Sequence, residues 1–220
     1  MAEEFSGEEK FFLNIAYETW KRVWSEVFQQ EMSLKMNLFS NDFTRQTRIV
    51  SLFHGRNCVG IGFMREIDLA LIATREDSYF GYWPQDILDH IAHNERERVI
   101  IASNFTIHHE YRRNKQFEWK ALFFSLYMDY YNTLSTPLMI TAARKLRHNE
   151  KLCYDVGGVC MKKDVPYRNG AIELSHELTD LLYWRKGVEF SLLNRELQSL
   201  REKIWWNFLK EQKNEKSRAA

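Results

Sequence analysis

The amino-acid sequence predicts a single mixed α+β domain in which helices flank a central sheet. Three observations carry this prediction. Residues 8–31 place apolar side chains at helical spacing, residues 48–64 form two β-rich runs around a tight turn, and residues 98–143 follow the order strand, basic turn, helix, strand. The third pattern is that of a β–α–β crossover, which joins parallel strands of one sheet. A chain of 220 residues is long enough to bury a full core in one domain.

The N-terminal half is expected to contain a long helix, a hairpin and a short helix. The helix over residues 8–31 carries a wide apolar stripe, and the hairpin over 48–64 turns near Gly55. Residues 67–83 are ambiguous between helix and strand. Pro84 suits the first turn of the short helix that follows.

The middle of the chain is expected to supply the centre of the sheet. RVIIASNFTI, residues 98–107, begins with a near-continuous apolar run that is typical of a buried central strand. A long helix over 114–134 and a strand over 137–143 complete the crossover. Residues 143–156 predict a further helix that is stopped by two glycines, Gly157 and Gly158.

The C-terminal part is expected to contain two strands, over 159–165 and 171–177, and a last helix over 187–211. The apolar face of this helix favours packing on the domain or a homodimer contact over a position at a membrane surface. No linker rich in glycine, serine or proline and no internal repeat occurs. We therefore expect one domain over residues 1–212 and a disordered tail over 213–220.

Composition excludes several functional classes. The formal net charge is +1, so the whole chain does not favour nucleic acid as a partner. The three cysteines form no C-x-x-C pair, which argues against a disulfide framework or a zinc site and for a reducing compartment. The acidic N-terminus lacks a signal core, and no apolar run approaches the length of an integral membrane segment. We expect a cytoplasmic protein.

Residues 106–122, TIHHEYRRNKQFEWKAL, follow the central strand and open the long helix. A strand that ends in a basic turn before a helix is a natural anion site, because the first backbone N–H groups of the helix are unpaired and its dipole favours negative charge. Glycine usually lets backbone approach a phosphate in such turns, yet none occurs here. Charged donors at Arg112, Arg113 and Lys115 are available instead, and a solvated charged turn without a ligand is the alternative.

Three pieces of the sequence resemble the GNAT superfamily, the Gcn5-related N-acyltransferases. The first is RVIIASNFTI ending in HHEYRRNKQF, where the superfamily has a strand and a pyrophosphate loop. The second is the helix EWKALFFSLYMDYYNTL with the strand PLMITAA. The third is NEKLCYDVGGVCM, in which Tyr154 precedes Gly158 by four residues. The resemblance implies a GNAT-like mixed central sheet flanked by helices, with a long N-terminal helix and an added C-terminal helix.

The basic turn departs from the superfamily pattern, because Arg113, Lys115 and Phe117 stand near positions where small residues are common. In this it is most similar to acyl-homoserine-lactone synthases and long-chain N-acyl amino acid synthases. Such enzymes can take acyl groups from acyl carrier protein (ACP), whose phosphopantetheine carries one phosphate. The resemblance implies acyl-ACP or acyl-CoA as donor substrate, an amine or amino acid as acceptor, and no permanently bound cofactor. The donor is expected at Thr106, Ile107, Arg112, Arg113, Asn114 and Lys115.

Acyl transfer to an amine needs a base, an oxyanion donor and a proton donor for the leaving thiolate. By position in the resemblance, Tyr154 is the candidate proton donor, and a core tyrosine is the alternative. A backbone N–H near Thr106 to His108, at a strand bulge, is the candidate oxyanion donor. His108, His109 and Glu110 are candidate bases, with exposed turn residues as the alternative.

Two further sequence patterns bear on the function of the protein. His90 and His93 lie one helical turn apart, but no third ligand is near them, so we expect no metal site. The aromatic residues over 123–131, with Trp119, either line an acyl tunnel or form plain core, and the N-terminal helix can cover the same cavity. Three functions follow: a long-chain N-acyltransferase, a catalytically inactive GNAT-like protein that binds a fatty ligand or a protein partner, or an ordinary acetyl-CoA enzyme.

Overall fold

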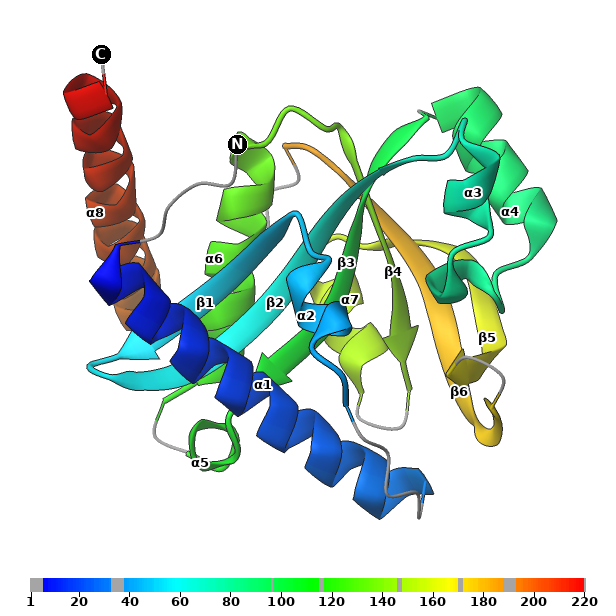
Figure 1. The fold of residues 1–220 in the computed structure, drawn as a ribbon, viewed down its shortest axis with the longest axis horizontal. Coiled ribbons are helices and arrows are strands. Elements are labelled where there is room, and N and C mark those ends of the chain that lie inside the picture. The colour runs from blue at the N-terminus through cyan, green and yellow to red at the C-terminus, as the bar shows by residue number, and fades with distance from the viewer. Residues whose placement is uncertain are drawn as a thin grey trace.

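A computed structural model describes residues 6–32, 38–95, 97–114, 117–145, 148–169, 172–187 and 193–219. Over these residues the chain forms one six-stranded sheet with the order β1-β2-β3-β4-β6-β5, shown in Figure 1. The strands are β1 (Arg48–His54), β2 (Asn57–Asp68), β3 (Arg98–Ile107), β4 (Leu138–Arg144), β5 (Val159–Asn169) and β6 (Ile172–Arg185).

Helices cover both faces of the sheet. In Figure 1, the N-terminal helix crosses in front of the strands, and the crossover helix lies behind them. The helices are α1 (Gly7–Met32), α2 (Asn41–Thr44), α3 (Ile72–Arg75), η1 (Ser78–Phe80), α4 (Gln85–His90), η2 (Ile91–Glu95), α5 (His109–Arg112), α6 (Trp119–Thr133), α7 (Asn149–Asp155) and α8 (Arg195–Ala219).

The central strands β3 and β4 are parallel, as the predicted crossover requires, and every other strand pair is antiparallel. Pairing between β3 and β4 is confined to Ile100 with Met139 and Ile101 with Ile140. Beyond these residues the two strands lose their register although both continue, so the sheet opens at its centre. This opening is the feature of the fold that positions the candidate site.

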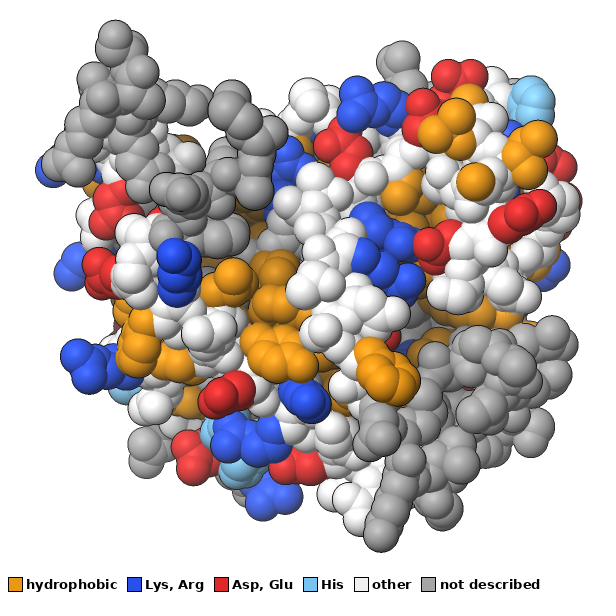
Figure 2. All heavy atoms as spheres, viewed as in Figure 1, with side chains coloured by type: hydrophobic (Ala, Val, Ile, Leu, Met, Phe, Trp, Pro, Cys, Tyr) orange, Lys and Arg blue, Asp and Glu red, His pale blue; other side chains and the backbone are white. Residues whose placement is uncertain are grey.

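The core divides between the two faces. Behind the sheet, α6 and α7 pack on side chains such as Met64 and Trp184. In front, α1 packs on β2 through a cluster that includes Trp20 and Phe63, and the segment 69–97 packs on the other half of the sheet through a separate cluster. On the described part of the face shown in Figure 2, acidic and basic side chains are interspersed rather than gathered by sign.

Most of the predicted elements are confirmed in the N-terminal two thirds. The helix over 8–31 corresponds to α1, the strand over 98–107 matches β3, and the hairpin turns through Gly55, whose φ is +61°. The helix expected over 114–134 begins only at Trp119, because residues 109–112 form the separate helix α5. The expected parallel crossover from β3 through α6 to β4 is confirmed.

Three boundaries were predicted wrongly. The helix expected over 143–156 is shorter, because β4 continues to Arg144 and His148 adopts a φ of +52°, which a continuous helix cannot contain. The strand expected over 171–177 extends to Arg185, because its second half pairs with all of β4. Helix α8 begins later than expected and continues to Ala219, through residues for which we expected a disordered tail.

Helix α8 packs against α6. Arg201 donates two hydrogen bonds to Asp129, at 2.7 and 2.5 Å, and Phe208 makes an edge contact with Tyr130. Trp206, on the other side of α8, is 68% exposed. None of the described helices combines the length and the apolarity that crossing a bilayer would take.

Candidate active site

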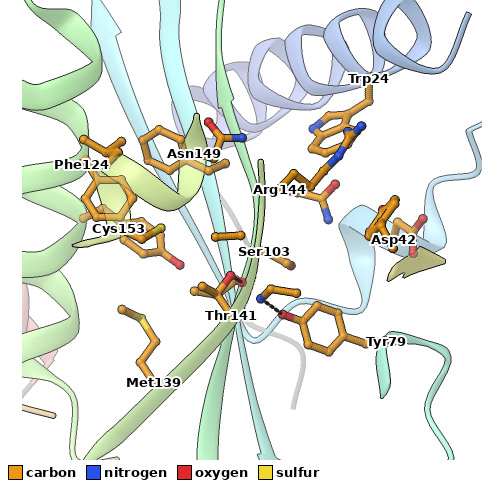
Figure 3. Close-up of a pocket in the computed structure, with 18 of the residues that line it drawn as sticks. Trp24, Asp42, Tyr79, Ser103, Phe124, Met139, Thr141, Arg144, Asn149 and Cys153 are labelled. Atoms are coloured by element: carbon orange, nitrogen blue, oxygen red, sulfur yellow. Dashed lines mark hydrogen bonds between the residues drawn. The ribbon is translucent and has the colours of Figure 1, made fainter. Parts of the chain in front are cut away.

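A cavity of about 290 Å³ lies where β3 and β4 diverge, and we call it the slot. It is lined from both faces of the sheet. Phe124 of α6 and Cys153 of α7 line it from behind, and Trp24 of α1 and Tyr79 of η1 line it from the front. Figure 3 shows these two groups on opposite sides of the strands. The slot therefore borders both faces of the sheet.

A β-bulge in β3 forms one edge of the slot. The register between β2 and β3 shifts between Ile61 and Phe63, opposite Thr106 and Ser103. Within the bulge, Asn104 adopts a φ of +52°, a conformation that asparagine tolerates better than most residues. We predicted a bulge near Thr106 to His108, and the structure has it two residues earlier in β3.

Helix α1 holds this bulge in place. Trp24 Nε1 donates to Thr106 Oγ1 at 2.9 Å, and Thr106 Oγ1 donates to the Asn104 carbonyl at 2.7 Å. Trp20 Nε1 lies 3.4 Å from Asn104 Oδ1. Thr106, predicted as a donor-binding residue, thus faces α1, and its hydroxyl is used within the protein.

The rear wall of the slot is aromatic. Phe105 stacks on Phe123 and contacts Phe124, while Tyr127 donates its hydroxyl to the Phe63 carbonyl at 2.8 Å. Phe124 and Tyr127 line the slot, whereas Phe123 is a core residue. The aromatic stretch over 123–131 therefore serves both as lining and as core.

Lysine and cysteine side chains lie at the rear, between α6 and α7. Lys120 Nζ lies 3.4 Å from Asn149 Oδ1, and Asn149 lines the slot. Burial and then the neighbouring Arg112 guanidinium lower the pKa of Lys120, although Cys153 and Glu150 act in the opposite direction. Burial raises the pKa of the Cys153 thiol to about 12, so it is not a thiolate near neutral pH.

Part of the front wall, at Ser78, Tyr79 and Tyr82, comes from segment 69–97, where the sequence was ambiguous at its start. Tyr79 accepts a hydrogen bond from the Ala142 N–H of β4 at 3.1 Å. Asp77 accepts from the Tyr79 N–H at 2.9 Å and from both terminal nitrogens of Arg65, at 2.7 and 2.9 Å. These bonds fix Tyr79 relative to β2 and β4.

A buried ion pair flanks the front wall. Arg144, at the end of β4, lines the slot and donates from Nε to Glu177 Oε1 at 2.6 Å and from a terminal nitrogen to Glu177 Oε2. Its guanidinium also lies 5.1 Å from the centre of the Tyr167 ring. Removing either partner would leave an uncompensated buried charge, so the ion pair is costly to break and holds Arg144 in place in the wall.

His108 lies on the α1 side of β3, outside the lining of the slot. Its Nε2 is 2.5 Å from a terminal nitrogen of Arg22, its side chain is 11% exposed, and its ring lies against His109. Burial, followed by the charge of Arg22, lowers the pKa of His108, so the neutral imidazole is favoured. Glu110 is exposed, with a carboxylate oxygen 4.0 Å from His108 Nδ1.

The basic turn forms a second hollow of about 380 Å³ against α1. His109, Arg112 and Arg113 line it from α5, opposite Glu26 and other residues of α1. The backbone N–H groups of this turn bond internally: Tyr111 and Arg112 donate to the His108 carbonyl, Arg113 to His109 and Asn114 to Tyr111. Lys115 lies outside the described residues.

Tyr154 lies on α7, and its hydroxyl donates to Asp180 Oδ2 of β6 at 2.7 Å. Burial, with Cys160 and Asp180, raises the pKa of Tyr154. Although burial opposes it, the hydrogen bonds from Tyr154, the Asp164 N–H and Lys145 hold the pKa of Asp180 below its ordinary value. Gly157, with a φ of +79°, ends α7 as predicted.

The structure thus places the predicted site residues in two separate regions. His108 and the arginines of the turn lie against α1, and Tyr154 lies between α7 and β6. Of the predicted catalytic and donor-binding residues that the structure describes, none lines the slot, although Phe105 and Cys153, adjacent to Thr106 and Tyr154, do. Within the described ranges, no cluster of histidine, cysteine and acidic residues is suited to hold a metal ion.

The six described strands, with one parallel pair at the open centre of the sheet, match a GNAT-like fold, and the comparisons with solved structures agree. A mosquito arylalkylamine N-acetyltransferase-like protein 5b superposes with a TM-score of 0.58 at 13% identity, over 79% of this chain and 94% of that one. FeeM, an N-acyl amino acid synthase from uncultured soil microbes, gives 0.52 at 8%, over 83% and 87%. BjaI, a CoA-dependent acyl-homoserine lactone synthase, gives 0.52 at 9%, over 89% and 82%.

These likenesses concern the fold. No family model matches the sequence, and no curated protein matches it. The neighbours include both kinds of synthase that the degenerate basic turn resembles.

Proposed function

We propose that the protein is an N-acyltransferase that moves an acyl chain from acyl-ACP or acyl-CoA to an amine, such as an amino acid. The observation that carries the proposal is the slot between β3 and β4, which is lined from both faces of the sheet. A donor and an acceptor that approach from opposite faces of the sheet would meet inside it. Transfer requires such a meeting point, because the thioester carbon and the amine must be held in contact away from bulk water.

The basic hollow favours a donor with a single phosphate. Because the backbone N–H groups of Tyr111, Arg112 and Arg113 bond within the turn, they are not available to an anion, which would meet the side chains of the hollow instead. His109, Arg112 and Arg113 offer cationic or polar donors suited to one phosphate group. This supports phosphopantetheine on ACP over the pyrophosphate of CoA, and an acidic carrier would be steered toward the same turn.

The apolar wall favours a long acyl chain. Trp24, Phe28 and Leu38 line the front of the slot, and Phe124 and Tyr127 line the rear. Such a wall gains free energy with each methylene that it covers, at about 0.8 kcal/mol per group. An enzyme restricted to acetyl-CoA would have little use for it.

Mass spectrometry of a transfer reaction tests the proposal. The purified protein is incubated with acetyl-CoA, palmitoyl-CoA or palmitoyl-ACP in the presence of a mixture of amines and amino acids. We expect N-acyl products, most abundantly from palmitoyl-ACP. Products from acetyl-CoA alone would favour the ordinary acetyltransferase, and no product from any donor would favour the inactive protein that binds a fatty ligand or a partner.

Two sets of variants then locate the donor site and test Tyr154. Combined Arg112→Ala and Arg113→Ala should raise the KM for acyl-ACP about tenfold or more with kcat little changed, because charge-assisted hydrogen bonds contribute about 1.5–3 kcal/mol each. Combined Lys203→Ala and Lys210→Ala, at exposed positions of α8, is the charge-matched control. If Tyr154 protonates the thiolate, Tyr154→Phe lowers kcat on the order of 10². An unchanged kcat with reduced stability would assign its hydroxyl to the contact with Asp180 alone.

A further inference from the structure

The Tyr79 hydroxyl occupies the gap between β3 and β4 at the level of the β3 bulge. The last paired residues of the two strands are Ile101 and Ile140, and the Thr141 hydroxyl then donates to the Ala102 carbonyl, so Ala142 lies one residue beyond this contact. Ala142 is the residue whose N–H donates to Tyr79, and Ser103 begins the bulge that contains Asn104. The ring reaches this point from the front face, from a segment that the basic turn and the crossover do not include.

The hydroxyl is arranged as a hydrogen-bond donor. Its oxygen already accepts the Ala142 N–H, and accepting a bond polarises the O–H group further. The Thr141 hydroxyl also lies beside the Tyr79 hydroxyl, but it donates its own hydrogen to the Ala102 carbonyl at 2.8 Å. Among the described residues, the acceptor that competes with a substrate oxygen for the Tyr79 hydrogen is therefore the neutral Thr141 hydroxyl oxygen.

Burial keeps this hydroxyl protonated. It raises the pKa of Tyr79 well above the ordinary tyrosine value, so the group donates a hydrogen bond across the physiological range but is a poor source of a proton. A donor of this kind suits the stabilisation of an oxyanion rather than the protonation of a thiolate.

The position of the ring is fixed from two directions. Asp77 accepts the Tyr79 N–H and is clamped by Arg65 of β2. Although burial opposes it, these bonds hold the pKa of Asp77 below its ordinary value, so the clamp stays charged. The ring itself packs against Phe80 and Trp83. Such preorganisation is what an oxyanion donor needs in order to contribute without a reorganisation cost.

We propose that Tyr79 donates a hydrogen bond to the carbonyl oxygen of the bound thioester and stabilises the oxyanion that forms there. This rests on the proposed acyl transfer. The amine nitrogen bonds to the thioester carbon, the carbonyl electron pair moves to oxygen, and the C–S bond then breaks as the carbonyl reforms. The proton lost by the amine passes through solvent and ends on the thiol product. Tyr79 keeps its own proton throughout.

Tyr79→Phe tests the assignment, because it keeps the ring and removes only the hydroxyl. We expect kcat for acyl transfer to fall on the order of 10², with the Kd for the acyl donor unchanged within about twofold. Tyr183→Phe is the matched control, since Tyr183 lies on the same face but does not line the slot. A kcat for Tyr79→Phe equal to that of the control would overturn the assignment.

A second readout does not depend on turnover. Ketone analogues of acyl-CoA and of acyl-phosphopantetheine, with ¹³C at the carbonyl that replaces the thioester, report hydrogen bonding through the carbonyl chemical shift. We expect a downfield shift on binding to the wild-type protein that is lost in Tyr79→Phe and kept in Tyr183→Phe. A shift retained in Tyr79→Phe would refute the role of Tyr79 and leave acyl transfer standing. Failure of the wild-type protein to bind either analogue would refute the proposed function and this assignment with it.

Discussion

Replacing Thr106 by valine should destabilise the protein by loosening the bulge from α1. The substitution keeps the shape of the side chain and removes one hydroxyl. That hydroxyl accepts from Trp24 Nε1 and donates to the Asn104 carbonyl, and Thr106 is only 2% exposed. The resemblance assigned Thr106 to donor binding, whereas the contacts predict a large part in stability.

The magnitude follows from the two broken bonds. Each orphaned partner costs about 1–3 kcal/mol, and the lower end applies because Trp24 and Asn104 are only partly buried. The sum is about 2 kcal/mol. The added methyl group returns up to about 0.8 kcal/mol, so the net loss is about 1.5 kcal/mol. For a chain of this length that lowers the Tm by roughly 3–6 °C.

Urea unfolding followed by circular dichroism measures this difference. Thr133→Val is the matched control, because Thr133 is exposed and its hydroxyl bond to the Tyr130 carbonyl stays within reach of water; its effect should stay within about 0.5 kcal/mol. A double-mutant cycle with Trp24→Phe should give a combined loss smaller than the sum of the single losses. Equal effects at Thr106 and Thr133, or strict additivity in the cycle, would refute the reasoning.

Three further predictions concern pH, packing and the C-terminal helix. The folded-state pKa of His108 is lowered, so as pH falls below about 6.5 the unfolded chain binds a proton that the folded chain does not. The free energy of unfolding should therefore fall as pH drops from about 7 to 5.5. In urea titrations, His108→Gln should reduce this dependence of the free energy of unfolding on pH. Gly62→Ala should cost about 1–3 kcal/mol in the same assay, because the new Cβ would lie 2.5 Å from the Tyr127 ring, whose hydroxyl is bonded; an unchanged Tm would contradict this packing. Arg201→Met should speed proteolytic cleavage within α8 about tenfold by removing both bonds to Asp129, and an unchanged cleavage rate would show that the apolar contacts alone hold the helix.

The sequence predicted the elements whose signal is local. The stripe of α1, the turn at Gly55 and the apolar run of β3 each lie within one short window, and the crossover follows from their order. The bulge was placed two residues late, although an asparagine at position 104 is a residue type that accepts positive φ. Its exact place depends on the register with β2, which no single window contains.

The candidate site was harder to predict because its contacts join distant segments. Tyr79 and Ala142 are 63 positions apart, and the aromatic run around Tyr79 has neither helical nor strand periodicity. The direction of a side chain was also not available from the sequence. Alternation along β3 offered two faces for His108, and only the packing of α1 decides that it meets Arg22 rather than the slot.

Two features of the structure bear on how the proposed substrates would be selected. The basic turn lacks glycine, and the front wall of the slot comes from outside the β3–α6–β4 crossover. In the turn, residues with side chains form α5, and the backbone N–H groups of Tyr111 to Asn114 bond within the turn, so the side chains that could meet a donor phosphate there are those of His109, Arg112 and Arg113. At the front wall, Trp24 and Tyr79 come from α1 and from the segment 69–97, both outside the strand–turn–helix unit that resembles the superfamily. The divergence of β3 and β4 therefore supplies the opening in the sheet, while α1 and the segment 69–97 supply side chains that line its front. Tyr82→Ala, which changes a lining residue of that segment and keeps Tyr79, should alter the relative rates of different amines in the transfer assay while donor binding at the basic turn persists, because that turn packs on α1 and not on this segment.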